Sequence, residues 1–299
     1  MTEIVRTPEE RFEGLPDFGY RPRYREVGGL RLAHLDEGAG PPVVFLHGEP
    51  TWSFLWRKVL PPVRDAGYRC VLPDLAGFGR SDKPVSQAWY SYDRHTALTA
   101  SLLDELDLRD ATLVVHDWGG PIGLRVAVEQ PDRVARLVAM DTGVFTGHQP
   151  MSEAWHRFAA FVARTSDLPV GLLVRRGCAR DPGDEVVAAY DAPFPGPAAK
   201  AGAKAFPALI PQSPDAPGAA AGQRTLATLR QDRRPLLLLW GEEDRPLPVA
   251  SGEAFAAALG RPPPRPVAGA GHYLQEDQGA EVGRLVAEWL ASEPRARPA

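Results

Sequence analysis

Leu113-Val114-Val115-His116-Asp117-Trp118-Gly119-Gly120 is the stretch of sequence that decides how the rest of the chain is arranged. Its β-branched apolar run ends abruptly at a carboxylate, and two glycines and a helical pattern follow. This order predicts a buried strand, a sharp turn and a helix. At such a turn Gly119 leaves room where a side chain would collide with the backbone. Asp117 is then either lifted clear of the sheet toward a ligand, or only the N-cap of the helix.

Strand and helix patterns alternate on both sides of this turn. A hairpin signal around Gly28-Gly29 comes first, and apolar runs typical of buried strands then alternate with helical patterns. Such alternation predicts an α/β fold, in which helices cover both faces of a mostly parallel sheet. The expected strands are 24–27 and 30–36 in the hairpin, then 42–47, 69–73, 111–116, 134–140, 235–240 and a short one near 266. The expected helices are about 53–66, 92–106, 119–129, 250–259 and 279–290.

The alternation stops between about Gly143 and Gly222. No strong strand pattern occurs there, and Ala, Pro and aromatic residues dominate. We expect this segment to be a helical insertion that forms a cap. The predicted domains are therefore an α/β core made of residues 1–143 and 223–299, and a helical cap made of residues 144–222.

Several of the predicted strands are followed closely by a titratable residue. In a mostly parallel sheet, ligands bind at the carboxyl ends of the strands, so these positions mark a candidate site. A random scatter of polar residues would rarely produce this arrangement. The residues are Glu49, Asp117, Asp141, Asp244 and His272.

Composition narrows the class of protein. The chain has 299 residues, 24% of them charged, and a formal net charge of −4, so nothing indicates a nucleic-acid partner. No apolar run approaches the roughly 20 residues of a membrane span, and the N-terminus lacks a secretory signal. Cys70 and Cys178 are far apart, which favours reduced thiols and a cytoplasmic protein. Four lysines against thirty arginines are typical of a GC-rich bacterial source.

No cofactor or metal ion is expected from the sequence. No cluster of His, Cys and carboxylate residues has the spacing of metal ligands. The glycines of Gly77-Phe78-Gly79 follow a strand, but the rest of a dinucleotide-binding pattern is absent.

Several motifs together resemble those of the α/β-hydrolases and, more narrowly, of the haloalkane dehalogenases. They are His47-Gly48-Glu49-Pro50-Thr51-Trp52-Ser53, Gly77-Phe78-Gly79-Arg80-Ser81-Asp82-Lys83-Pro84, the turn at Asp117, Asp244 and Gly271-His272. These core motifs also occur in epoxide hydrolases, whereas Glu49 and a tryptophan in the cap favour a dehalogenase. The resemblance implies an eight-stranded, mostly parallel sheet with an inserted cap. It also implies hydrolysis of haloalkanes to a primary alcohol, halide and a proton, through a covalent alkyl–aspartate ester.

The position of Asp117 suits a nucleophile that attacks saturated carbon. In α/β-hydrolases this turn is the nucleophile elbow, which usually carries a serine. A carboxylate that displaces a leaving group forms an ester, and water can hydrolyse that ester to regenerate the enzyme. A serine would form an ether, which water cannot hydrolyse in this way.

His272 is the expected general base for the hydrolytic water, and Asp244 is its expected acid partner. Asp141 is a competing choice, because it lies where related dehalogenases carry their acid. Either aspartate could hold the imidazole in the required tautomer.

Two anions also need hydrogen-bond donors. The backbone N–H groups of Glu49 and Trp118 are expected to form the oxyanion hole. An indole N–H only donates, so Trp118 and Trp155, the one tryptophan in the cap segment, are the expected halide donors. The Glu49 side chain, by resemblance, positions the hydrolytic water. The expected cavity walls are Phe158, Phe161, Phe194, Phe206 and Leu209.

Three other functions remain open at this stage. An epoxide hydrolase would share Asp117 and His272, but it needs tyrosines in the cap, and only Tyr190 is present. A non-catalytic ligand-binding protein would be expected to lack part of the triad. A haloacid dehalogenase would need cations near the substrate carboxylate, and the cap arginines are Arg157, Arg164, Arg175, Arg176 and Arg180. The expected partners are a small apolar halogenated substrate and a halide ion, bound by a monomer or small homo-oligomer.

Overall fold

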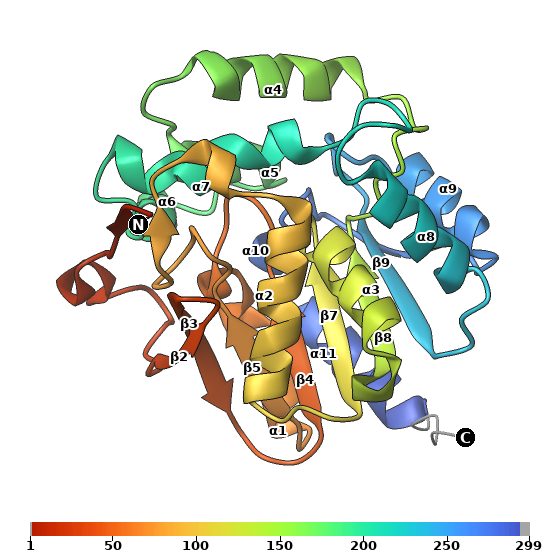
Figure 1. Ribbon diagram of the computed structural model, residues 1–299. Helices are drawn as coiled ribbons and strands as arrows, with labels where there is room; N and C mark the ends of the chain where they lie inside the picture. Colours follow the sequence, from red (N-terminus) through yellow and green to blue (C-terminus); the bar gives the residue numbers. More distant parts are fainter. Residues whose placement is uncertain (1, 294–299) are drawn as a thin grey trace.

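The computed structural model describes residues 2–293 and has one main sheet at its centre (Figure 1). Within these residues the sheet contains eight strands in the order β10-β9-β8-β7-β4-β5-β3-β2. Only the pairings of β3 with β2 and with β5 are antiparallel, so the predicted mostly parallel sheet is confirmed. The strands are β2 (Arg23–Val27), β3 (Leu30–Glu37), β4 (Pro42–Leu46), β5 (Arg69–Pro73), β7 (Ala111–His116), β8 (Val134–Met140), β9 (Leu236–Gly241) and β10 (Arg265–Val267).

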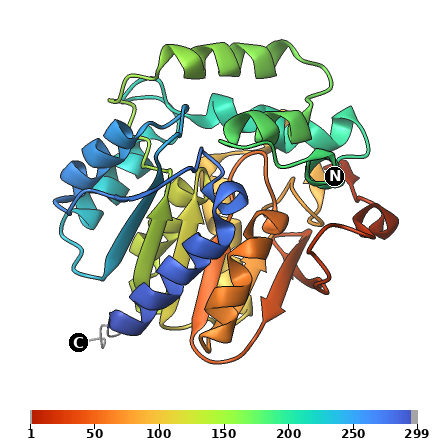
Figure 2. The same cartoon turned by 180° about the vertical axis from the view of Figure 1, so that it is seen from behind.

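Helices cover both faces of this sheet, as Figures 1 and 2 show from opposite sides. One face carries α2 (Tyr92–Glu105), α3 (Gly119–Glu129) and α8 (Ala219–Leu229), and the other carries α1 (Leu60–Asp65) and α11 (Gly279–Ser292). The helix α9 (Val249–Leu259) packs beside β9. Because the central strands are covered on both sides, every residue of β7 and β8 is buried, which explains their continuous apolar runs.

Between β8 and α8 the chain forms helices that lie over one end of the sheet (Figure 1). No strand occurs among the described residues of this segment. The helix α8 packs against α3 of the core, so the predicted domain boundary at residues 222 and 223 falls inside a helix. The division into core and cap stays a prediction. The helices before α8 are α4 (Glu153–Arg164), α5 (Val170–Gly177), α6 (Asp184–Asp191), η5 (Pro197–Lys200), α7 (Ala201–Ala205) and η6 (Phe206–Leu209).

Two local features differ from the sequence-based expectation. The single helix expected over residues 53–66 is divided into η2 (Ser53–Lys58) and α1, since Pro61 and Pro62 lack the N–H groups that would continue a helix. Proline suits the first turn of a new helix, where those N–H groups would be unpaired anyway. The N-terminal region contains β1 (Ile4–Val5), which pairs with β6 (Lys83–Pro84), and η1 (Glu9–Phe12). The remaining short elements are η3 (Gln87–Trp89), η4 (Pro131–Arg133) and α10 (Leu274–Asp277).

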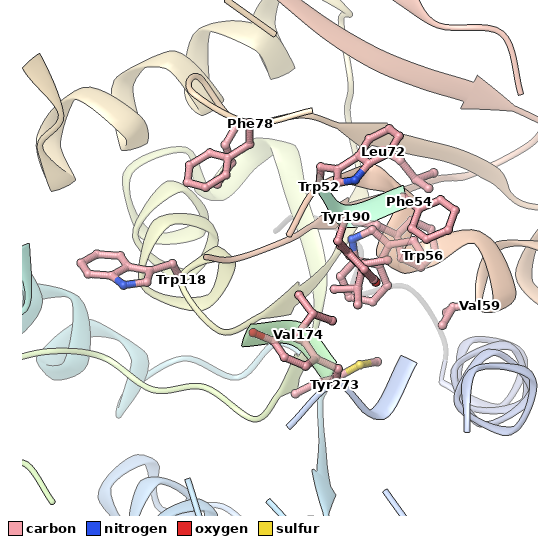
Figure 3. Close-up of a cluster of buried hydrophobic side chains, with 14 of the residues drawn as sticks. Trp52, Phe54, Trp56, Val59, Leu72, Phe78, Trp118, Val174, Tyr190 and Tyr273 are labelled. Carbon is pink, nitrogen blue, oxygen red and sulfur yellow. The ribbon is translucent and has the colours of Figure 1, made fainter. Parts of the chain in front are cut away.

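A buried polar contact fixes α6 to the core. Glu276 of α10 accepts hydrogen bonds from the Arg57 guanidinium, and both side chains are only 1% exposed. The Tyr190 hydroxyl of α6 donates to the same carboxylate at 2.5 Å. Figure 3 shows Tyr190 beside Trp52 and Phe54, and the Trp52 indole donates to the carbonyl of Ala189. These buried contacts therefore join α6 to η2 and α10.

None of the helices in residues 2–293 combines the length and the apolar character that crossing a membrane requires.

Candidate active site

The turn between β7 and α3 lifts the Asp117 side chain above the sheet. Asp117 has a φ of +46°, in the left-handed region that non-glycine residues rarely adopt. The turn also needs its glycines, because a Cβ on Gly119 would lie 2.1 Å from the carbonyl oxygen of Leu46. A Cβ on Gly48 would lie 2.1 Å from Asp117 Oδ1. The backbone therefore presents the carboxylate in one fixed position rather than burying it under the first turn of α3.

Two backbone N–H groups face the Asp117 carboxylate. The N–H of Glu49 donates to Oδ1 at 2.7 Å, and the N–H of Trp118 also interacts with the carboxylate. Burial of Asp117 opposes its ionisation, but the attraction of His272 outweighs burial, and the pKa of Asp117 is lowered. Its side chain remains 21% exposed toward a cavity. An ionised oxygen that faces open space is the arrangement that a nucleophile requires.

His272 lies between two carboxylates. Its Nδ1 is 2.8 Å from Asp244 Oδ2, and its Nε2 is 3.7 Å from Asp117 Oδ2, which is too long for a hydrogen bond. Burial lowers the pKa of His272, but the charge of Asp244 and the nearby Asp117 outweigh burial and raise the pKa well above its ordinary value. The other oxygen of Asp244 accepts the N–H of Leu247 at 2.8 Å. Asp244 thus holds the imidazole in a fixed orientation with Nε2 directed toward Asp117.

Asp141 lies near this group but makes a different contact. Its Oδ1 accepts the N–H of Gly241 at 3.0 Å, and its buried Oδ2 has no hydrogen-bond partner among the described residues. Burial, and then the charge of Asp244, raise the pKa of Asp141 well above its ordinary value. No hydrogen bond joins Asp141 to His272 within residues 2–293. The geometry therefore favours Asp244 over Asp141 as the partner of the imidazole.

The five strand-end residues come from five consecutive strands of the sheet, β4, β7, β8, β9 and β10. Four of them contact the imidazole or the Asp117 carboxylate, whereas Asp141 is hydrogen-bonded to Gly241. The Glu49 side chain lines the same cavity, and one of its oxygens is buried without a partner among the described residues. Burial, and then the charge of Asp117, raise the pKa of Glu49 well above its ordinary value, which favours a neutral carboxyl group.

A cavity of about 1100 Å³ opens above Asp117. Both indoles expected to bind halide line it, Trp118 from the turn and Trp155 from α4. The expected walls are only partly correct. Phe158 and Phe161 line the cavity, but Phe206 packs against Phe78 and Trp118, and neither Phe194 nor Leu209 lines it. Pro207 and Ile210 line it instead, because the short helix η6 turns these side chains toward the opening.

Two further residues contact the site: His116, which directly precedes Asp117 and for which the sequence predicts a structural role, and Tyr273, to which no role was assigned from the sequence. His116 Nε2 lies 2.8 Å from the carbonyl oxygen of His272, so it donates to that oxygen, and burial lowers the pKa of His116 to about 4. Tyr273 lines the cavity, and its hydroxyl has no hydrogen-bond partner in the described part of the chain. Figure 3 shows this hydroxyl end pointing toward the side on which Trp118 lies. Only their positions next to Asp117 and His272 could have identified them.

The cap tyrosine that an epoxide hydrolase would use is occupied elsewhere. Tyr190 donates to Glu276 and does not line the cavity. No group of three His, Cys, Asp or Glu residues that could hold a metal ion occurs within residues 2–293. The groups available for chemistry are therefore a carboxylate, an imidazole with its acid partner, and hydrogen-bond donors around an apolar cavity.

Comparison with known proteins shows which family the chain resembles over its length. Residues 41–278 match the family model described as the alpha/beta hydrolase fold. A haloalkane dehalogenase of Mycolicibacterium paratuberculosis is 42% identical, over 96% of this chain and 98% of the relative. A haloalkane dehalogenase of Psychrobacter cryohalolentis is 38% identical, over 98% of this chain and the full length of the relative. The solved tetrameric haloalkane dehalogenase of Paraglaciecola agarilytica superposes with a TM-score of 0.91 at 38% identity, over 97% of this chain and 99% of that chain.

Proposed function

The chain belongs to the haloalkane dehalogenases of the α/β-hydrolase fold, and we propose that Asp117 is the nucleophile of its reaction. The enzyme hydrolyses carbon–halogen bonds and releases halide. Asp117 Oδ2 attacks the carbon that bears the halogen, the carbon–halogen bond breaks, and an alkyl ester of Asp117 forms. The low pKa of Asp117 keeps the carboxylate ionised, so this step needs no base.

The second half of the reaction returns the free carboxylate. His272 Nε2 takes a proton from water, and the resulting hydroxide attacks the ester carbonyl. The N–H groups of Glu49 and Trp118 already face the Asp117 carboxylate, and they stabilise the oxyanion that forms there. Asp244 stabilises the imidazolium. We assign the Glu49 carboxyl group to positioning the water, and the products are a primary alcohol, halide and a proton.

The departing halide requires donors in an apolar environment. We assign this role to the indole N–H groups of Trp118 and Trp155, since both side chains line the cavity. An indole N–H has no acceptor lone pair, so it suits an anion and does not compete as a nucleophile. The apolar walls of Phe158 and Phe161 exclude water and strengthen these hydrogen bonds.

The observation that supports this assignment best is the imidazole of His272, hydrogen-bonded to Asp244 and directed toward Asp117. The test is incubation of His272→Gln with 1-bromobutane, followed by intact mass spectrometry. The variant should release one equivalent of bromide and gain the mass of a butyl group on the peptide that contains Asp117. Repeated turnover by this variant would contradict the role of His272, and the absence of an adduct would contradict the role of Asp117.

Two finer properties remain proposals. We propose a monomer or small homo-oligomer, and the tetrameric relative makes sedimentation velocity the measurement to use. A cytoplasmic location is supported by Cys70 and Cys178, which are both buried and unpaired, and fractionation of the native host would test it.

A further inference from the structure

Three arginines line the cavity, and they come from separate elements. Arg157 lies on α4, Arg176 on α5, and Arg245 on the loop after β9. Among residues 2–293, the only acidic residues that line the same cavity are Glu49 and Asp117, at its floor. Of the cap arginines considered from the sequence, only Arg157 and Arg176 reach the cavity, and nothing in the sequence placed Arg245 there.

These arginines lie where the cavity meets solvent. All three residues are exposed, unlike the floor residues Asp117 and His272. Arg157 is paired with Glu153 of the same helix at 2.5 Å. Arg176 and Arg245 make no hydrogen bond or ion pair within residues 2–293. The mouth of the cavity is therefore positive, although the whole chain carries a formal net charge of −4.

The wall between mouth and floor is largely apolar. Phe158, Phe161 and Leu173 line it. The cavity thus presents three zones to a ligand: free cations at the rim, hydrocarbon and aromatic surface below them, and the Asp117 carboxylate at the floor. This sequence of zones complements a molecule with an anionic head, an alkyl chain and a reactive carbon at the far end.

We propose that the enzyme prefers haloalkanes that carry an anionic group at the end remote from the halogen, such as ω-haloalkanoates. This inference rests on the proposed function of Asp117. The carboxylate of the substrate lies at Arg176 and Arg245, and the halogen-bearing carbon lies at Asp117. α-Haloacids are excluded from the preferred class, since their carboxylate would lie beside the Asp117 carboxylate and repel it.

The chemistry at the reacting carbon is unchanged. Asp117 Oδ2 forms the new bond to the ω-carbon, and the halide leaves with the electron pair of the broken bond. Water then hydrolyses the ester, and its proton is taken by His272. The products are an ω-hydroxyalkanoate, halide and one proton. The carboxylate of the substrate takes no part in bond making.

The test compares three substrates of equal chain length that differ in charge. They are 6-bromohexanoate, 6-bromohexanamide and 6-bromohexyltrimethylammonium, each measured by bromide release from the full-length enzyme. At low ionic strength kcat/KM for the anion should exceed that for the amide about tenfold, and the cation should be the poorest. The difference should shrink as salt screens the rim. In a series of ω-bromoalkanoates that includes bromoacetate, kcat/KM should be highest for a chain longer than that of bromoacetate.

Substitutions of single arginines test which residues cause the preference for the anion. Arg176→Gln and Arg245→Gln should lower kcat/KM for 6-bromohexanoate and leave that for the amide unchanged. Arg176→Lys should retain most of the preference, because it keeps the positive charge. Arg224→Gln removes the same charge from an exposed position of α8 that does not line the cavity, so it serves as the matched control.

Several results would overturn the proposal. Equal kcat/KM for the anion and the amide would show that the rim does not select charge. If Arg176→Gln and Arg245→Gln lower kcat/KM for the anion and the amide equally, the effect is structural. If Arg224→Gln lowers kcat/KM for the anion as much as they do, only the global charge matters. If none of these substrates releases bromide and 1-bromobutane gives no adduct on Asp117, the assignment of Asp117 fails instead, so the two failures are distinguished.

Discussion

Replacing Asp244 with Asn should slow the hydrolytic step strongly while leaving alkylation intact. Asn keeps the oxygen that accepts the Leu247 N–H, but it places an NH₂ group where Asp244 Oδ2 meets His272 Nδ1 at 2.8 Å. Two donors then face each other, and the imidazole is driven to the tautomer that carries its proton on Nε2. That tautomer cannot accept a proton from water. Loss of a hydrogen bond to a charged group removes about 1.5–3 kcal/mol, which slows ester hydrolysis roughly 10- to 150-fold.

The measurement is rapid-quench halide release with 1-bromobutane. Asp244→Asn should give a burst of one equivalent of bromide followed by a slow steady rate, and the ester on Asp117 should accumulate. Asp141→Asn is the matched control, since Asp141 contacts Gly241 and makes no hydrogen bond to His272. It should alter the steady rate by less than about threefold, or about 0.6 kcal/mol. If Asp141→Asn abolishes turnover and Asp244→Asn remains active, the choice of acid is wrong.

Three further perturbations test other parts of the structure. Trp155→Phe should weaken bromide binding in calorimetry roughly 10- to 150-fold, the value of one hydrogen bond to an anion, whereas Trp289→Phe outside the cavity should leave it unchanged. Glu276→Gln leaves the buried Arg57 without its counter-charge, so the free energy of unfolding in urea should fall by about 3–5 kcal/mol, and a smaller loss would mean that water reaches the guanidinium. Burial lowers the pKa of His95 from 6.5 to about 3, so its contribution to stability is complete above pH 6.5 and is lost as the pH falls toward 3. The free energies of unfolding of the wild type and of His95→Gln, measured in urea, should therefore converge as the pH falls from 7 to 4. Free energies that stay parallel over this range would contradict a neutral buried imidazole.

The sequence predicted the elements that are buried on both faces most accurately. The strands at 111–116 and 134–140 have the expected bounds, because a continuous apolar run with turn residues on both sides fits little else. The helix expected over residues 53–66 was wrong in its continuity, although Pro61 and Pro62 were visible. The prediction followed the hydrophobic periodicity of the segment and gave too little weight to the N–H groups that the two prolines lack.

The details of the site depend on contacts that sequence spacing does not contain. Asp141 and Asp244 follow neighbouring strands, but only Asp244 is hydrogen-bonded to His272, whereas Asp141 accepts the N–H of Gly241. The chemical type of a side chain also did not reveal whether it faces the cavity. Phe206 and Phe158 are alike in sequence, but the first packs below Trp118 and the second lines the opening. The predicted roles of the site residues await the experiments above.

The position of His272 between two carboxylates links the two halves of the catalytic cycle. On the proposed roles, esterification of Asp117 neutralises one of the charges that hold a proton on the imidazole. The proton affinity of His272 therefore drops once the alkyl group has been transferred, which is when an unprotonated nitrogen is needed. Hydrolysis restores the negative charge and, with it, the higher affinity. On these proposed roles, the covalent state of Asp117 sets the base strength of His272.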